Sequence, residues 1–592
     1  MNESTIVRSS LIVLLCVSVS LMGCRRSVPS ESSESEGYDP RNDPLVNPAS
    51  LFEAVPDDVT QVESDETLYL HLEGSPNTLH PFFVSSGVEF TVVDTLYTGL
   101  FTFDKNMTWR PNEEIVESFE ESDDHTIFTV KMKPGFTWQD GAPFTAHDIV
   151  YSWQQILDPQ VPTLTQKPTT EPITECVAID DYTVKYVQPE ALATAKWNLS
   201  FPIIPKHIFE KGKKDNPDLK TGDYYLNLSR QPVGSGPYKV VEWKENDKIV
   251  VERWENYKGK KPYFKRIVFR IIPDKNITLL SFEKEEVDCI DRLSPQQFSR
   301  ETNTPSFSKV GYKGWGTMWQ LGYIGWNMDG SNPFFANRKV RHAMTHALNL
   351  PLILDKVFYN LAGQCSGQFH PDSWMYNPEV KLLDYNLDKS RQLLDEAGWI
   401  VSADDGWRYK GVEGKNVRFE FTLLMPQGSA TSPKTAAIFQ ADLKSIGVEM
   451  KTRTIEWSSF LEKVREHEFQ ASIAAWGTGT DPDTGWNLWR TDQYKLGRNY
   501  VGYSNARVDE LFVLGRKEFD FEKRRAVYQE IHKILYKDQP YTWIYNEAIL
   551  SAFNKRIRGV QFSPRGIYGF NPSFTGWWVK KGQAKHVEMA TP

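Results

Sequence analysis

Apolar residues alternate with polar ones, or form short β-branched runs, in a series of segments after residue 66, and each segment predicts a strand. The predicted strands are Thr67–Leu72, Thr126–Met132, Tyr182–Val187, Lys248–Arg253, Lys265–Ile272, Arg418–Leu424 and Val448–Thr454. Other segments carry apolar residues three or four positions apart, which indicates helices at 145–157, Asn386–Ala397, Thr435–Ile446 and Glu522–Lys537. Strands and helices alternate without a fixed repeat, which predicts an α/β fold.

The ends of these helices carry recognisable capping residues. Thr145 and Asp148 have the spacing of a capping box, and Asp158-Pro159 ends the helix that follows them. Gly398 and Gly447 come directly after the next two helices, where a left-handed cap favours glycine. The sequence therefore predicts the positions of these helices as well as their type.

The first residues have the pattern of an export signal. Arg8 precedes the apolar run Leu11–Met22, which is too short to span a bilayer comfortably, and Gly23 and Cys24 follow it. This ending resembles a bacterial lipobox, so residues 1–23 are predicted to be a lipoprotein signal peptide and Cys24 the lipidated first residue. An ordinary secretory signal with a chance cysteine is the alternative.

Residues 24–65 are rich in Asp, Glu, Ser and Pro and poor in aromatic residues. Such a stretch buries too little apolar surface to offset its chain entropy, so we expect a disordered acidic tether. Its role would be to hold the globular body, which begins at residue 66, away from a membrane.

Composition excludes several classes of protein. With 592 residues and 40% hydrophobic content the chain is long enough for two or more lobes. A net charge of −9 without a basic block argues against nucleic acid as a partner, and one long apolar run argues against a polytopic membrane protein. Cys176, Cys289 and Cys365 form no CxxC pair, so we expect buried free thiols.

Motifs for catalysis are missing. The chain has no GxxxxGK[ST], no GxSxG and no HExxH, and its one SxxK match, Ser306–Lys309, is too short to be informative. His342 and His346 have a spacing that could hold a metal, but no third ligand is near, so a solvated helix face is the simpler interpretation. We therefore expect no enzyme activity, no metal and no cofactor.

Aromatic residues are abundant, with 19 Trp, 25 Tyr and 33 Phe. Most must lie in cores, but a roomy pocket with flat walls would use some of them. The pocket candidates are Trp476, in a Gly-rich strand-to-loop corner, and Trp486 and Trp489 just after it.

Several segments, in order, are similar to the hallmarks of extracellular solute-binding protein family 5, which contains the oligopeptide- and dipeptide-binding proteins of ABC importers. They are Trp138–Trp153, Val233–Tyr238, Glu252–Tyr257, Asn337–Met344, Tyr385–Asp388 with Leu394–Trp399, and Tyr503–Asn505 with Asp509. The similarity extends from Thr67 to about Trp578. Within it, Gly234 and Gly236 indicate a sharp backbone corner, so we assign both to the scaffold rather than to ligand contact.

The resemblance implies a type II periplasmic-binding-protein fold, with two large lobes, a smaller inserted subdomain and a closing hinge made of two crossing strands. The implied division is lobe I at 66–101, 232–325 and 565–592, subdomain II at 102–231, and lobe III at 326–564. A ligand would be buried between the closed lobes.

The resemblance also implies a binding mode, in which an extended peptide is added as a strand between sheet edges of the two lobes. Ser86, Gly87 and Val88 would present one edge, and Trp476, Gly477 and Thr478 the other. Trp457 would be a pocket wall, with core packing as the alternative, and Trp486 would also contact ligand.

The chain departs from the family at one position. Peptide binders of the family carry an Asp three residues after the strand tryptophan, where it pairs with the ligand ammonium; here that residue is Gly479. Asp481 lies two residues further on and, in an extended chain, on the same side, so it could replace the missing Asp.

The sequence thus predicts a lipid-anchored, monomeric, extracytoplasmic binding protein that delivers peptides to a membrane permease served by a separate ATPase. An oligosaccharide or metal chelate as ligand is the first alternative. A secreted enzyme is the second, and a ligand turned over by the protein would favour it.

Overall fold

The computed structural model describes residues 38–161, 163, 166–215, 229–479 and 483–585. Its strands are β1 (Thr67–Leu72), β2 (Phe101–Phe103), β3 (Trp109–Pro111), β4 (Val116–Glu121), β5 (Ile127–Met132), β6 (Glu175–Asp180), β7 (Thr183–Val187), β8 (Tyr238–Lys244), β9 (Lys248–Arg253), β10 (Arg266–Ile271), β11 (Cys289–Ile290), β12 (Gly311–Trp326), β13 (Gly363–Gln364), β14 (Ile400–Val401), β15 (Arg408–Val412), β16 (Lys415–Arg418), β17 (Glu420–Pro426), β18 (Glu449–Ile455), β19 (Ala471–Gly477), β20 (Tyr541–Asn554), β21 (Ile557–Arg558) and β22 (Trp578–Val579). Within this part of the chain no helix is long and apolar enough to cross a bilayer.

The helices are α1 (Gly87–Leu96), α2 (Ala146–Leu157), α3 (Lys167–Thr170), α4 (Ala195–Asn198), α5 (Lys206–Asp215), α7 (Lys275–Glu283), α8 (Pro305–Val310), α9 (Arg338–Ala347), α10 (Leu350–Lys356), α11 (Leu387–Glu396), α12 (Ser432–Ser445), α13 (Trp457–Arg465), α14 (Asp483–Trp489), α15 (Gln493–Leu496), α16 (Ala506–Lys517) and α17 (Phe521–Asp538). Short 3-10 or π turns are η1 (Pro40–Asn42), η2 (Ala49–Phe52), η3 (Val59–Gln61), η4 (Gln297–Glu301) and η5 (Phe574–Gly576).

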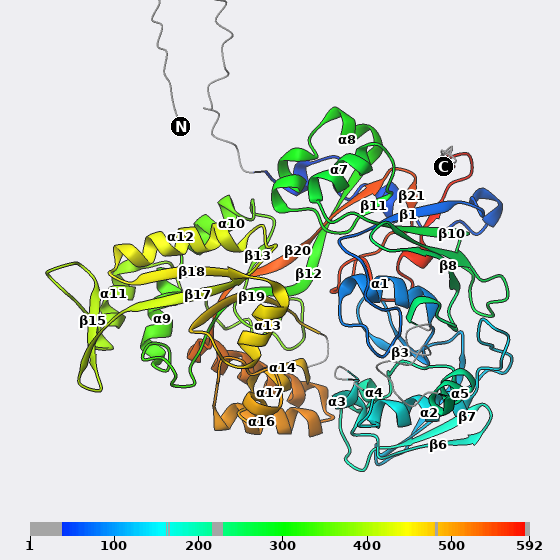
Figure 1. Ribbon diagram of the computed structural model, residues 1–592, viewed down its shortest axis with the longest axis horizontal. Helices are drawn as coiled ribbons and strands as arrows, with labels where there is room; N and C mark the ends of the chain where they lie inside the picture. Colours follow the sequence, from blue (N-terminus) through cyan, green and yellow to red (C-terminus); the bar gives the residue numbers. More distant parts are fainter. Residues whose placement is uncertain (1–37, 162, 164–165, 216–228, 480–482, 586–592) are drawn as a thin grey trace, which may run out of the picture. The chain divides into compact units, whose positions relative to one another are not determined.

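One mixed sheet links both lobes, in the order β18-β17-β19-β12-β20-β11-β1-β10-β9-β8, with β13 added at β20. The long strands β12 and β20 pair antiparallel and lie side by side at the centre of Figure 1. Their register shifts between Thr317 and Leu321, so Met318–Gln320 bulges away from β20. A bulge bends its strand and weakens the ladder locally, which makes this the position for a hinge.

Most of the predicted strands are confirmed within two residues. β1 and β9 have the predicted bounds, and β5, β7, β10 and β18 shift by one residue at an end. The segment Arg418–Leu424 is the exception, because a break at Phe419 divides it between β16 and β17. Phe419 is fully buried and carries the chain from a small hairpin into the main sheet.

The predicted helix caps are also confirmed, although α12 begins at Ser432, earlier than the predicted Thr435. Thr145 caps α2, and its backbone N–H donates to Asp148 Oδ2 at 2.8 Å, as a capping box requires. Gly398 and Gly447 follow α11 and α12 with φ of +84° and +80°. A Cβ built on Gly234 would stand 1.9 Å from the Leu96 carbonyl oxygen, so this glycine is required by the close approach of two backbone segments.

A separate antiparallel sheet, β4-β5-β7-β6, forms the inserted subdomain together with α2. Its core also contains Phe82, Leu100, Trp254 and Tyr257 from lobe I, so the insert and lobe I share apolar packing. In the other direction, lobe I reaches further along the chain than expected. Ile549 and Phe553 of β20 are already part of its core, well before residue 565.

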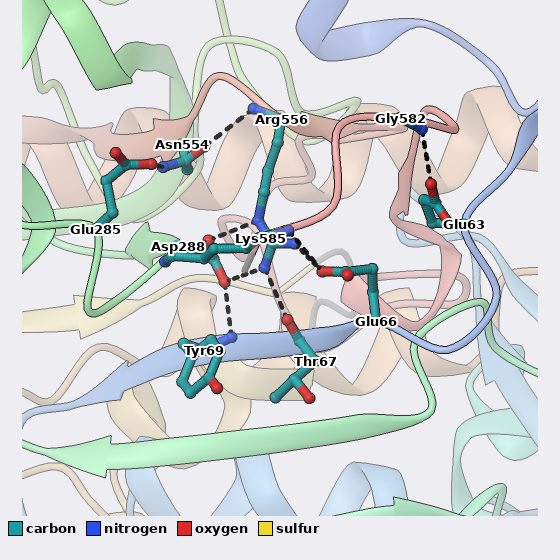
Figure 2. Close-up of polar contacts among 10 residues, drawn as sticks. All are labelled: Glu63, Glu66, Thr67, Tyr69, Glu285, Asp288, Asn554, Arg556, Gly582 and Lys585. Carbon is teal, nitrogen blue, oxygen red and sulfur yellow. Dashed lines mark hydrogen bonds and ion pairs between the residues drawn. The ribbon is translucent and has the colours of Figure 1, made fainter. Parts of the chain in front are cut away.

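Buried charges join segments that are far apart in the chain (Figure 2). Asp288, completely buried, accepts hydrogen bonds from Arg556 Nε at 3.0 Å and Nη2 at 2.7 Å, and from Lys585 Nζ at 3.3 Å. It also accepts from the Tyr69 backbone N–H at 2.9 Å, while Arg556 binds Glu66 as well. The network therefore fastens β1 and the C-terminal segment to the residue before β11.

The expected acidic tether is wrong for its described part, from residue 38 on. Asn47 exchanges two hydrogen bonds with the backbone of Trp315, at 2.6 and 2.9 Å, and Leu51 is fully buried. Asp43 forms an ion pair at 2.8 Å with Lys313, whose side chain is buried in β12. A few specific contacts thus order a segment whose average composition indicated disorder. Residues 1–37, which include the predicted signal peptide and Cys24, lie outside the described residues.

Candidate functional site

A cavity of about 1040 Å³ opens beside the middle of the main sheet. Four chain segments that are distant in sequence supply most of its wall, together with a few residues of lobe III. They are α1 with the residues after it, Asp291–Leu293 following β11, Tyr545–Leu550 of β20 without Asn546, Arg565–Gly576, and the lobe III residues Phe358, Leu361, Ala362 and Thr431.

One face of α1 forms a wall of this cavity. The helix starts at a capping box, in which Ser86 Oγ accepts from the Glu89 N–H at 3.3 Å and Glu89 Oε2 accepts from the Ser86 N–H at 3.1 Å. Gly87, Thr91 and Asp94 follow each other at intervals of three or four residues, so they share one side of the helix and all line the cavity. A stripe of small and polar residues therefore faces the open space.

Two carboxyl groups of the cavity wall lack a partner. Among the acidic residues that line it, Glu73 pairs with Lys275 at 3.3 Å, Glu114 accepts from the Tyr257 hydroxyl at 2.7 Å, and Asp291 lies 3.5 Å from His71. Asp94 and Glu547 make no hydrogen bond or ion pair within the described part of the chain, and Glu547 Oε2 is buried without a donor.

The surroundings of these two carboxyl groups shift their protonation. Burial raises the pKa of Asp94 to about 6, although Arg565 opposes the shift. Burial likewise raises the pKa of Glu547, opposed mainly by Arg292. Perturbed groups inside a cavity are typical of functional sites, because structure alone gains nothing from an unpaired buried charge.

A second cavity, of about 900 Å³, has six aromatic residues in its wall. Its aromatic residues come from the insert, the hinge and lobe III: Trp109, Phe119, Trp197, Trp319, Trp374 and Phe562. Trp319 and Thr317 line this cavity, whereas Met318, between them, lines the first. The bulge of β12 therefore stands between the two cavities.

Strand β19 has an unpaired edge beside the hinge. It pairs with β12 from Ala471 through Gly477, but with β17 only at Ala471 and Ser472. From Ile473 to Gly477 no described strand pairs with the β17 side. Thr478, just after it, donates from its N–H and its Oγ1 to the Trp319 carbonyl at 2.7 and 3.0 Å, which fixes the end of β19 against the aromatic cavity.

The predicted edge at Ser86, Gly87 and Val88 is wrong in form. Only Ser86 is extended, with φ −121° and ψ 155°, and the next two residues begin α1. The capping box satisfies backbone N–H groups at the start of α1, so this segment forms the first turn of a helix and not the edge of a sheet. Gly87 and Val88 do line the large cavity, but as helix residues.

The predicted aromatic contacts divide into three outcomes. Trp476 lies on β19, is half-buried and donates from Nε1 to the Tyr541 hydroxyl at 3.2 Å. It lines neither of the two cavities. Trp457 is 52% exposed, which excludes core packing for it, and it lines neither cavity. Trp486 lies 3.8 and 3.7 Å from the guanidinium groups of Arg490 and Arg516, which occupy both faces of its ring, so no face is left for a ligand.

Several other expectations can be placed. Asp481 lies outside the described residues. One ring nitrogen of His342 is hydrogen-bonded to the Lys537 carbonyl, and one of His346 to the Asp384 carbonyl. Among the described residues, no cluster of possible metal ligands occurs. The three cysteines are buried free thiols, as predicted.

Sequence reasoning missed the charged groups of the large cavity. Asn546 and Glu547 together interrupt the largely apolar strand β20, and an acid at such a place was a usable signal. Asp94 lies on a helix whose polar stripe, Gly87, Thr91 and Asp94, was also readable. The helix was not predicted because Ser86–Val88 had been assigned to a sheet edge.

Comparison with known proteins gives the same picture. Residues 110–496 match the family described as bacterial extracellular solute-binding proteins, family 5 middle. The oligopeptide-binding protein AppA of Bacillus subtilis is 28% identical over 525 residues, covering 86% of this chain and 90% of the relative. The dipeptide-binding protein of Escherichia coli is 25% identical over 531 residues, covering 85% and 94%. The solved structure of Bacillus subtilis AppA in complex with a nonapeptide has a TM-score of 0.74 at 27% identity, covering 88% of this chain and 100% of the other.

Proposed function

Because the chain belongs to family 5 of the bacterial extracellular solute-binding proteins, we propose that it captures peptides between two closing lobes for an ABC importer. The observation that carries the proposal is the unpaired edge of β19, because β19 pairs with β12 and the bulge of β12 lies between the two cavities. The relatives named as oligopeptide- and dipeptide-binding proteins support peptides as the ligand class.

In the proposed mechanism, hydrogen bonds to the peptide backbone provide the affinity, and the cavities accept peptide side chains of different sizes. The edge from Ile473 to Gly477 spans roughly 16 Å at about 3.3 Å per residue, enough for a short extended peptide. Strand addition gives sequence-independent hydrogen bonds. Side chains of the peptide would alternate in direction and enter the two cavities, where water fills the space that smaller side chains leave.

The surrounding system is part of the proposal. Cys24 would carry the lipid that holds the protein at the outer side of a bacterial membrane, and the closed form would dock as a monomer on a permease with a separate ATPase. The lobes would close by bending at the Met318–Gln320 bulge.

A backbone N-methyl scan of a bound peptide tests the binding mode. Ligand is first identified by mass spectrometry of the protein purified from its native host, and synthetic copies are methylated at one amide at a time. Strand addition predicts an alternating pattern in calorimetry, because every second amide faces β19 and the others face away. Equal losses at all positions, or at none, would refute strand addition.

A partner for the ligand ammonium is a finer part of the proposal. Asp481 would replace the family Asp, whose position is taken here by Gly479, so free peptides should bind more tightly than N-acetylated ones. Asp481→Asn should remove most of that difference, since a buried ammonium needs an opposite charge. Equal affinity of the wild type for both peptides would reject this ammonium site.

A second ligand class is favoured by one observation, the six aromatic residues around the 900 Å³ cavity. Flat aromatic walls also suit stacked sugars or chelates. A thermal-shift panel of peptides, oligosaccharides and nickel complexes separates the two classes, and stabilisation by sugars or chelates alone would overturn the peptide proposal.

A further inference from the structure

The 1040 Å³ cavity is lined by an acidic side chain, Asp94 of α1, that has no hydrogen-bond or ion-pair partner among the described residues. It is open to the cavity, whereas Glu73, Glu114 and Asp291 on the same wall already have partners. Glu547 is the other unpaired acid, but its Oε2 is buried, whereas the Asp94 side chain is exposed to the cavity. Asp94 is therefore the carboxyl group best placed to meet a ligand.

We propose that Asp94 is the subsite for a positively charged side chain of the ligand, an ammonium or guanidinium group, and so determines specificity at one peptide position. The inference rests on the proposed peptide-binding function. It concerns a side-chain position, since the ligand's own terminus is assigned to Asp481 on lobe III.

The geometry of the cavity favours this chemistry. A cation on a flexible apolar stem fits a wall in which Asp94 stands among Val88, Phe90 and Tyr97 of the same helix region. The stem would pack on these apolar groups while its charge reaches the carboxylate. Asp94 is exposed to the cavity and has no ion-pair partner among the described residues, so a ligand cation would pair with it without displacing a protein group.

The charges around Asp94 define how its ionisation should affect binding. Arg565 faces it from the C-terminal segment; the other charged groups of the cavity are Glu73, Glu114, Lys260, Lys261, Asp291, Arg292, Glu547 and His71. Asp291 outweighs the effect of burial on His71 and raises its pKa. Because His71, with its raised pKa, is a second titratable group of the cavity, the pH dependence assigned to Asp94 is the part that Asp94→Asn removes.

The test uses peptides that differ only in one side-chain charge. A library of synthetic pentapeptides with free ends carries either lysine or acetyl-lysine at each position in turn, and binding is measured by calorimetry. At one position lysine should bind about tenfold to a hundredfold more tightly, as for a charge-assisted hydrogen bond. Asp94→Asn should reduce that preference to about twofold or less, while Glu73→Gln, the matched control in the same cavity, leaves it unchanged.

Two further readouts separate this role from a structural one. The melting temperature of the ligand-free protein should not fall in Asp94→Asn, since Asp94 makes no hydrogen bond or ion pair to the described residues that the change would break. For the wild type, lysine peptides should bind about tenfold more weakly at pH 5 than at pH 7.5, because a carboxyl with a pKa of about 6 is mostly protonated at pH 5. Asp94→Asn should lack this dependence.

The outcomes distinguish the two proposals. If peptides bind but show no lysine preference at any position, or one that Asp94→Asn does not change, the subsite is refuted and the peptide-binding function stands. If no peptide of the library binds, both proposals fall together.

Discussion

Replacing Asp288 by asparagine tests whether the buried charge network holds lobe I together. Its carboxylate accepts four hydrogen bonds, from Tyr69 N–H at 2.9 Å, Arg556 at 3.0 and 2.7 Å, and Lys585 at 3.3 Å. The uncharged amide of the variant cannot neutralise Arg556 and Lys585. Its NH2 group would also face the N–H donors of these two residues. Glu66 then remains as the one carboxylate bound to Arg556, among the residues that the structure describes.

The expected cost is large because both ions are almost fully buried, with 6% of the Arg556 side chain exposed and none of Asp288. Removing one partner of a buried ion pair costs about 3–5 kcal/mol. Local opening free energies are the appropriate measure, since a protein with several lobes need not unfold in one step. A loss of this size corresponds to about a hundredfold or greater acceleration of amide exchange.

Hydrogen-exchange mass spectrometry of β1 and β11 provides the assay, with β5 of the inserted sheet as an internal reference that should not change. The control variant is Asp247→Asn, which removes an exposed ion pair with Lys244 and should leave exchange in β1 nearly unaffected. Acceleration below about tenfold in β1 of Asp288→Asn would refute the reasoning.

The stability that Asp288 contributes should also depend on pH, in a direction that its pKa determines. Burial alone would raise the pKa of Asp288, but Arg556 and Lys585 together lower it below its usual value of 3.8. A carboxyl group with a lowered pKa contributes stability above its unfolded pKa and loses it as pH falls through the folded one. The difference between wild type and Asp288→Asn should therefore stay constant from about pH 8 to 5 and shrink below about pH 4.

Three further predictions concern single residues. Cys24→Ala should release a folded protein from the membrane, and a variant that still sediments with membranes after a high-salt wash would contradict lipid anchoring. Gly234→Ala should cost about 3 kcal/mol or more of unfolding free energy in urea, because its Cβ would meet the Leu96 carbonyl oxygen at 1.9 Å; Gly411→Ala, with open space around it, is the neutral control. Trp476→Ala should weaken binding of the co-purifying ligand about tenfold or more in calorimetry with little change in apo melting temperature; a large stability loss at unchanged affinity would place this residue in the core instead.

The sequence by itself determined the elements whose signals are local. The capping box of α2, the glycine after α11, and the alternation of β1 and β9 each depend on residues that are neighbours in the chain. The glycines at 234 and 236 indicated a tight backbone corner, but the contact that requires Gly234, with the Leu96 carbonyl oxygen, lies far away in the chain.

Only the tertiary structure decided the rest, because it depends on partners far away in the chain. β12 has no clear alternation, and its glycines make sense only beside β20: a Cβ on Gly322 would lie 2.0 Å from the ring of Tyr545. The ordering of residues 38–65 depends on β12 in the same way, through Lys313 and Trp315. The large cavity brings Asp94 and Glu547 onto one wall, and no local pattern can encode a site whose parts are separated by most of the chain.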